Sequence, residues 1–357
     1  MRLEQSKART KQPFKSIAAC LLTLFSYAGA AQADDCKYRV GYSEPAGAQE
    51  IQSTFGKALV AAGKQRGICV TVMDAALDVN KQLQAVNLFV AQKMDAIAIY
   101  PLSPDSLNPA LTRARDAGIK VIGLSATIAD AQPTESILPY DALYDQNSGV
   151  QGAHLLAEYV KEKLAGKGSV IGVGIGIPVP GLKFMVDNYK KGVTTDSSID
   201  WLATVDNPTD DLAGAQRVMN QALIRFQGTE IGAVMAYNTS SAVGAYNALR
   251  ASRRGNDVLV VGQNGDVLGI DALREGKLDA VVDLVPWRSG LMVADLVERV
   301  IEGKEHPTLT FGRVELYTQE ALTNRLDWTT ALAQISSGEL TCENGGCPSD
   351  AEAMKAY

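Results

Sequence analysis

Short apolar segments alternate with longer amphipathic segments along almost the whole chain, and this alternation constrains the fold more than any other feature. Continuous apolar runs of this length predict strands buried on both faces, and the segments between them predict helices. The predicted strands are 38–42, 69–73, 96–100, 121–124, 170–174, 233–236, 258–261 and 280–285. The predicted helices are 50–64, 79–92, 107–117, 149–164, 212–225, 241–250 and 288–301.

The strands recur at the spacing of one strand-and-crossover unit, roughly 30 residues. Because they are too numerous for one small sheet, we predict an α/β fold with two Rossmann-like lobes, each built on a parallel sheet. Residues 126–145 interrupt the helical rhythm with Pro133 and Pro139, so the chain is expected to cross between the lobes there. The polar tail after Glu320 is expected to pack outside both lobes.

Hydrogen-bonding side chains follow most of the predicted strands. Ligands of open parallel sheets bind beyond the carboxyl ends of the strands, and a buried hydroxyl left unpaired costs roughly 1–3 kcal/mol. These strand-end positions therefore suit a polyhydroxy ligand, although turns of any α/β protein are rich in the same residue types. They hold Ser43, Glu44, Ser125, Tyr237, Asn238, Gln263 and Asn264, and Asp283 lies within the last predicted strand.

The first 33 residues have the pattern of a secretory signal peptide. A basic segment precedes a short apolar segment, and Ala31-Gln32-Ala33 forms an A-x-A cleavage site. We predict cleavage after Ala33 and export to the periplasm, because the apolar segment is too short for an ordinary spanning helix. The basic residues are Arg2, Lys7, Arg9, Lys11 and Lys15.

Removal of that segment takes away five basic residues and one acidic residue, which changes the formal net charge from −6 to −10. A protein this acidic is repelled by nucleic acids and by anionic membranes, so we expect neither as a partner. The four remaining cysteines suggest two pairs, Cys36 with Cys69 and Cys342 with Cys347, as suits an oxidising compartment, although the sequence leaves the connectivity open. Zinc is the alternative for the second pair, but two thiolates rarely complete a site, and no metal or cofactor is predicted.

Several segments together resemble the periplasmic sugar-binding proteins of the ribose-binding type, whose fold is shared by the ligand-sensing domains of lactose-repressor-like regulators. The resemblance covers about residues 37–317. The segments are QKMDAIAIYP (92–101), AGIKVI (117–122), AVMAYN (233–238), VVGQNG (260–265) and GKLDA (276–280).

The resemblance implies a type I periplasmic binding protein with two lobes joined by a three-strand hinge. Residues 37–145 and 285–312 would form one lobe, 146–284 and 313–320 the other, and 321–357 a C-terminal extension. It also implies that sugar contacts fall on Ser43, Glu44, Ser125, Lys183 in the turn 181–184, Thr209, Asn238, Asn264 and Asp283.

The chain also departs from that type of protein. Pro45-Ala46-Gly47-Ala48 stands where paired aromatic residues often stack on a sugar, and Lys183 stands for an arginine, which is the better bidentate donor. Phe184, Tyr237 and Trp287 are the candidates for a replacement stacking face. These changes broaden the expected ligand from a ribose or hexose to a small polar solute, with a sugar or polyol favoured.

The predicted function is delivery of this solute to an ABC transporter permease by a monomer whose lobes close on it. A periplasmic sensor that presents its ligand to a chemoreceptor or histidine kinase is the alternative, since both uses need the same closed shape. An enzyme is not favoured. Gly172-Val173-Gly174-Ile175-Gly176 misses the G-x-G-x-x-G spacing of a nucleotide-binding loop, and neither His154 nor His306 has an evident catalytic partner.

Overall fold

Residues 36–125, 137–177, 179–254, 257–349 and 352 are described by the structure, a computed structural model. The predicted signal peptide and residues 126–136 of the predicted crossing, which include Pro133, lie outside these ranges.

Six strands form the first of two sheets, and every neighbouring pair in it is parallel. They are β1 (Tyr38–Glu44), β2 (Ile68–Asp74), β3 (Ala96–Ile99), β4 (Lys120–Leu124), β5 (Ala142–Asp145) and β11 (Leu309–Phe311). Their order across this first sheet is β11-β5-β4-β3-β1-β2. The buried run Ala96–Ile99 at its centre explains why apolar segments identified these strands.

Six further strands form the second sheet, in which β12 runs antiparallel to β10 and the other pairs are parallel. They are β6 (Lys167–Ile175), β7 (Ser198–Asn207), β8 (Ala233–Ala236), β9 (Leu259–Asn264), β10 (Ala280–Asp283) and β12 (Glu315–Tyr317). The order is β12-β10-β9-β8-β6-β7. The described chain therefore passes between the sheets after β5, after β10 and after β11.

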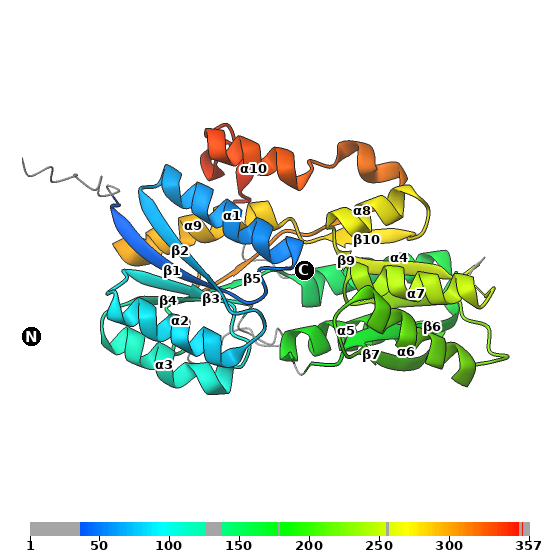
Figure 1. The fold of residues 1–357 in the computed structure, drawn as a ribbon. Helices are drawn as coiled ribbons and strands as arrows, with labels where there is room; N and C mark the ends of the chain where they lie inside the picture. The colour runs from blue at the N-terminus through cyan, green and yellow to red at the C-terminus, as the bar shows by residue number, and fades with distance from the viewer. Residues whose placement is uncertain (1–35, 126–136, 178, 255–256, 350–351, 353–357) are drawn as a thin grey trace, which may run out of the picture. The chain divides into compact units, whose positions relative to one another are not determined.

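Helices cover both faces of each sheet. In Figure 1, α2 (Val79–Ala91) and α3 (Pro104–Asp116) lie on one face of the first sheet, and α1 (Glu50–Gln65) and α9 (Pro286–Glu302) lie on the other. Helices α4 (Ala153–Lys163) and α5 (Pro180–Thr194) share a hydrophobic cluster with one face of the second sheet. Its other face packs against α6 (Leu212–Arg225), α7 (Thr239–Ala251) and α8 (Val267–Arg274).

Aspartate residues begin several of these helices. Asp78, Asp211 and Asp266 each accept a hydrogen bond from the first turn of the helix that follows, which satisfies amide groups that have no partner within the helix. Asn238 does the same for α7. Strand-end loops of this fold therefore need Asp and Asn for helix capping as well as for any ligand.

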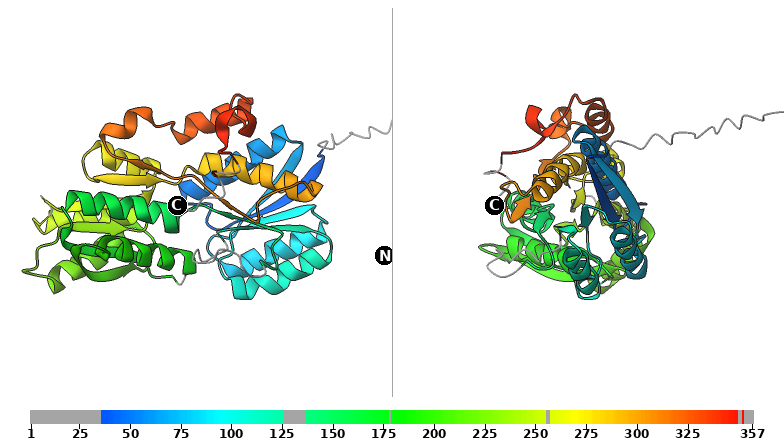
Figure 2. Two further views of the ribbon diagram at one scale, coloured as in Figure 1. Left: turned by 180° about the vertical axis from the view of Figure 1, so that it is seen from behind. Right: turned by 90° about the vertical axis from the view of Figure 1, so that its left-hand side faces the viewer.

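The C-terminal segment packs on the first sheet's helices. Helix α10 (Trp328–Ser337) buries Trp328, Ala331 and Ile335 in the cluster that contains α1 and α9. These residues recur at helical spacing, so they form an apolar stripe that the expectation of a polar external tail overlooked. Figures 1 and 2 show this red segment running along α1 and α9.

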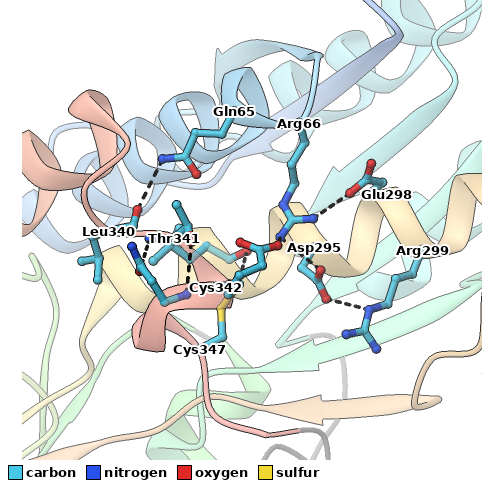
Figure 3. Close-up of a disulfide and its surroundings, with 12 residues drawn as sticks. Gln65, Arg66, Asp295, Glu298, Arg299, Leu340, Thr341, Cys342 and Cys347 are labelled. Carbon is cyan, nitrogen blue, oxygen red and sulfur yellow. Dashed lines mark hydrogen bonds and ion pairs between the residues drawn. A yellow bond between two sulfur atoms is a disulfide. The ribbon is translucent and has the colours of Figure 1, made fainter.

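Polar contacts hold the end of this segment in place. The side chain of Gln65 donates to the carbonyl oxygen of Ile335 at 2.6 Å and to that of Leu340 at 3.3 Å, and Figure 3 shows the second of these bonds. Arg66 contacts Glu298 at 2.6 Å, also drawn in Figure 3, and Glu343 at 2.7 Å. Cys342 and Cys347 form a disulfide beside these contacts.

The other disulfide joins Cys36 to Cys69, with a Cα–Cα distance of 5.5 Å. Cys69 lies in β2, which pairs with β1 in parallel register from Tyr38 opposite Ile68. The two cysteines therefore lie where neighbouring parallel strands begin.

Several elements differ from the expectation. Four strands, β5, β7, β11 and β12, were not predicted. Strand β7 lies at an edge and is partly exposed, and β11 and β12 have three residues each. Strand β5 is buried, but it has four residues and ends in Asp145. The predicted turn 181–184 is instead the first turn of α5, which begins at Pro180, a residue suited to the first position of a helix. Residues 172–175 of the glycine-rich segment lie inside β6 rather than after it.

In the part of the chain that the structure describes, no helix has the length and apolar character needed to cross a membrane.

Candidate ligand-binding site

A pocket lies where the carboxyl ends of strands from both sheets converge. From the first sheet and its helices it is lined by Gln49, Gln52, Tyr100 and Gln146. From the second sheet and its loops it is lined by Asp210, Tyr237, Asn238, Gln263 and Asn264. The position agrees with the general rule for ligands of parallel sheets.

Asp210 is the centre of a hydrogen-bond network in this pocket. Its carboxylate accepts from the Asn238 side chain at 2.9 Å, from the Gln49 side chain at 2.6 Å and from the Tyr237 hydroxyl. Gln49 precedes α1, whereas Asp210 follows β7, so one of these bonds links the two sides of the pocket. Burial raises the pKa of Asp210, and the three hydrogen bonds act in the opposite direction.

Gln263 contributes a buried amide at the carboxyl end of β9. Its nitrogen donates to the Tyr189 hydroxyl at 2.7 Å and to the Ser148 carbonyl at 3.1 Å. Its side-chain oxygen has no hydrogen-bond partner among the described residues, although the side chain is fully buried. This oxygen lies against Gly152, and a buried acceptor without a donor costs free energy.

Apolar side chains form the remaining walls. Leu77 and Leu102 line the pocket from the first sheet's side. The other apolar residues are Pro45, Ala46, Ile51, Ile175, Ile177, Val179, Leu182, Met185 and Leu284. A ligand that fits this lining presents polar groups in one direction and carbon-bound hydrogens in another, as ring and chain polyols do.

Nine ligand contacts were predicted, namely the eight implied by the resemblance and Phe184. Two of them, Asn238 and Asn264, line the pocket. Asn264 ends β9 with a φ of 119°, a backbone conformation that asparagine adopts more readily than most residues. Tyr237 and Gln263, which the strand-end rule also selected, lie beside them. The rule therefore placed four neighbouring side chains of the second sheet in one cavity.

Three predicted residues of the first sheet are not among the residues that line the pocket. Ser43 is fully buried, and its hydroxyl has no partner within the described residues. The carboxylate of Glu44 lies against Gly56 of α1, and burial raises its pKa. Ser125 lies in a small adjoining cavity with Tyr42 and Gln146.

Three more predicted contacts lie outside the pocket, two of them in the first turns of α5 and one just before α6. Lys183 is 76% exposed on α5 and is ion-paired with Asp187 one turn later. Phe184 packs against Gly149. Thr209 hydrogen-bonds to Asp211, the residue that caps α6, at 2.9 Å.

Asp283 has partners from the C-terminal segment instead of lining the pocket. Arg325 forms an ion pair with its carboxylate at 2.8 Å, and the Trp328 indole donates to it at 3.0 Å. Both charged side chains are almost completely buried. Arg325 also donates to the carbonyl oxygen of Gly265, next to Asn264, at 2.7 Å, so the segment after Glu320 supports a loop of the pocket.

Two polar residues of the pocket were missed because their strands were missed. Gln146 follows β5 and Asp210 lies just beyond β7, so both obey the strand-end rule. A search for alternating rather than continuous apolar residues would have detected β7, which is partly exposed at the sheet edge. Trp287, a candidate stacking residue, is buried in the core with α9.

The described residues contain no cluster of three or more His, Cys, Asp or Glu side chains placed to hold a metal. His154 lies in α4, and His306 lies in the connection before β11. The glycine-rich residues within β6 are constrained by packing, because a side chain at Gly172 would collide with Trp201.

The comparison with protein-family models gives the class. Residues 40–305 match the model described as periplasmic binding protein domain, and the chain belongs to this family.

Individual relatives share less than a third of their aligned residues with this chain. The chain is 27% identical over 265 residues to the ribose import binding protein RbsB of Bacillus subtilis, covering 72% of this chain and 79% of that protein. It is 22% identical over 291 residues to the xylitol-binding protein of Mycolicibacterium smegmatis, covering 74% of each.

Solved structures show the same fold. The periplasmic binding protein component of the arabinose ABC transporter from Shewanella sp. ANA-3 superimposes with a TM-score of 0.71 at 22% identity, covering 84% of this chain and 95% of that one. A solute-binding protein from Bacillus halodurans with bound myo-inositol gives a TM-score of 0.69 at 23% identity, covering 84% and 99%. The two-sheet architecture is that of type I periplasmic binding proteins.

Proposed function

We propose that this protein is the periplasmic solute-binding component of an ABC importer and that it binds a sugar or polyol in the pocket between its two sheets. The observation that carries the proposal is the convergence of amide, hydroxyl and carboxylate side chains from both sheets on one partly apolar cavity. The names of the relatives support it, since they include proteins for ribose, xylitol and arabinose.

The proposed mechanism is closure of two lobes on the ligand. Gln49 and Gln146 reach the pocket from the first sheet's side, and Asp210 and Asn238 reach it from the second's. A ligand that contacts both groups binds the closed form better and shifts the equilibrium toward it. The permease then recognises the closed form. We propose the lobe bounds given by the resemblance, with the three passes between the sheets as the hinge.

The proposal includes export by a cleavable signal peptide ending at Ala33 and action as a monomer without a catalytic function. The two disulfides support an oxidising compartment. The acidic net charge supports a diffusing protein that avoids anionic surfaces.

A thermal-shift screen of the purified protein over pentoses, hexoses, sugar alcohols and inositols, with amino acids as the control series, tests the proposal. A ligand of the native state at 100 times its dissociation constant stabilises the fold by about 2.7 kcal/mol. We expect at least one carbohydrate to raise the melting temperature, and calorimetry to give one site. Stabilisation by amino acids alone would contradict the assignment.

A further inference from the structure

We infer that the preferred ligand of this pocket carries a protonated amine as well as hydroxyl groups, so that it is an amino sugar or an aminopolyol. This inference rests on the proposed function and narrows its ligand class.

Asp210 is the one acidic side chain among the described residues that line the pocket, and the same lining contains no lysine, arginine or histidine. Its hydrogen-bond donors, Gln49, Tyr237 and Asn238, are all neutral. The nearest acid in sequence, Asp211, adds repulsion rather than compensation. A partly buried carboxylate is thus held by dipoles alone, without an opposite charge.

The surrounding charged groups do not supply that opposite charge. Arg217, on α6, acts on Asp211 and reaches the Thr209 hydroxyl at 3.5 Å. Glu50 of α1 accepts a hydrogen bond from the backbone amide of Val267, the first residue of α8. It thereby places a second negative charge at the N-terminus of α8. Among the described groups, the charge next to Asp210 is therefore predominantly negative, which attracts cations and repels carboxylates and phosphates.

The number of donors on an ammonium group also suits the Asp210 carboxylate. An ammonium group has three donors and no acceptor, whereas a hydroxyl has one donor. A ligand with an ammonium group can therefore offer Asp210 more than one donor, and its hydrogen bond to Asp210 is charge-assisted and shorter than a neutral one.

Calorimetry on the purified wild-type protein tests the inference with matched ligands: glucose with glucosamine, galactose with galactosamine, and myo-inositol with an amino-substituted inositol. The N-acetylated sugars serve as controls that keep the nitrogen but remove its charge. We expect the best amine to bind at least tenfold more tightly than both its hydroxyl and its N-acetyl counterpart.

In Asp210→Asn, the amine and its neutral counterparts should bind with about equal affinity. The affinity for the neutral ligands should change much less than the affinity for the amine. Asp206→Asn is the matched control, because Asp206 is an exposed carboxylate of β7 that does not line the pocket. Circular dichroism establishes that each variant is folded. If Asp210→Asn does not fold, the comparison of amine with N-acetyl amine in the wild type still decides the question.

Tight binding of a neutral sugar with equal or weaker binding of its amine overturns the inference and leaves the proposed function standing. A preference for the amine that persists in Asp210→Asn also overturns the inference, because a residue other than Asp210 would then recognise the ammonium group. If no member of either series binds, the inference is rejected, whereas the proposed function is decided by the wider thermal-shift screen.

Discussion

At the scale of single residues, Asp145 shows how burial alters a carboxylate of the first sheet. It ends β5 beside the pocket residue Gln146 and accepts a hydrogen bond from the backbone amide of Asn147 at 2.6 Å. Burial raises its pKa from 3.8 to about 6, and the amide of Asn147 only partly opposes this effect. The folded protein therefore holds this proton to a higher pH than the unfolded chain does.

Replacing Asp145 by Asn should stabilise the protein at neutral pH. Below pH 3.8 both states are protonated, so ionisation contributes nothing; between 3.8 and about 6 the unfolded state ionises first, and stability is lost as the pH rises. The difference in pKa corresponds to about 3 kcal/mol as an upper limit. Urea unfolding should show a gain at pH 7 that is mostly absent at pH 4.

Asp187→Asn is the control for this change. Asp187 is 59% exposed on α5, where its ion pair with Lys183 is worth little. We expect its free energy of unfolding to stay within about 1 kcal/mol of the wild type at both pH values. An equal gain for Asp145→Asn at pH 4 and pH 7 would contradict the explanation by burial.

At the scale of elements, the segment that carries α10 links the two sheets. Arg325 and Trp328 contact Asp283 at the end of β10, and the following helix packs on α1 and α9. Because Asp283 is nearly fully buried, its charge depends on these donors, and burial raises its pKa to about 6 even with Arg325 beside it. The segment is thus part of the folded core rather than an accessory tail.

Replacing Arg325 by Met should destabilise the protein at pH 7 by about 3–5 kcal/mol, because it leaves a buried carboxylate without its cation. Adding Asp283→Asn should recover much of that loss, since the amide oxygen can still accept from Trp328. Chemical unfolding of the single and double variants measures both effects.

The control is Arg274→Met, which breaks an exposed ion pair with Asp271 and should cost less than about 1 kcal/mol. A loss from Arg325→Met no larger than that of the control would show that Asp283 does not depend on Arg325.

At the scale of the whole molecule, the start of α1 contacts the second sheet's side twice. The Gln49 side chain donates to Asp210, and the Glu50 carboxylate accepts from the Val267 backbone at 3.0 Å. Gln49 lines the pocket and Glu50 is the next residue in the chain, so we expect both contacts to favour the same closed arrangement that the proposed ligand favours.

The double variant Gln49→Ala/Glu50→Ala should therefore have a larger radius of gyration than the wild type without ligand. It should also bind the ligand more weakly, because less of the protein is in the binding-competent form. Small-angle scattering with and without the carbohydrate found by screening measures the first effect, and calorimetry measures the second.

Ser53→Ala/Lys57→Ala, on the exposed side of the same helix, is the matched control. We expect it to behave as the wild type in both measurements. A wild-type protein whose scattering does not change on ligand binding would contradict closure.

The sequence predicted the parts of this protein that depend on local patterns. The two sheets and most of their helices followed from apolar runs and amphipathic segments, because burial on both faces leaves a signal in every residue of a strand such as β3. Asn238 and Asn264 in the pocket followed from their place after such strands. The partly exposed β7 left no such signal, so Asp210 beyond it was not predicted.

The tertiary structure decided which polar side chains share a cavity and which pair with each other. Asp283 and Asn264 end neighbouring strands, yet Arg325, 42 residues after Asp283, forms an ion pair with Asp283, whereas Asn264 lines the pocket. Local patterns fix burial and secondary structure, because each residue's neighbours in the chain determine them. The partner of a buried charge depends on residues distant in sequence, and only the folded chain brings these together.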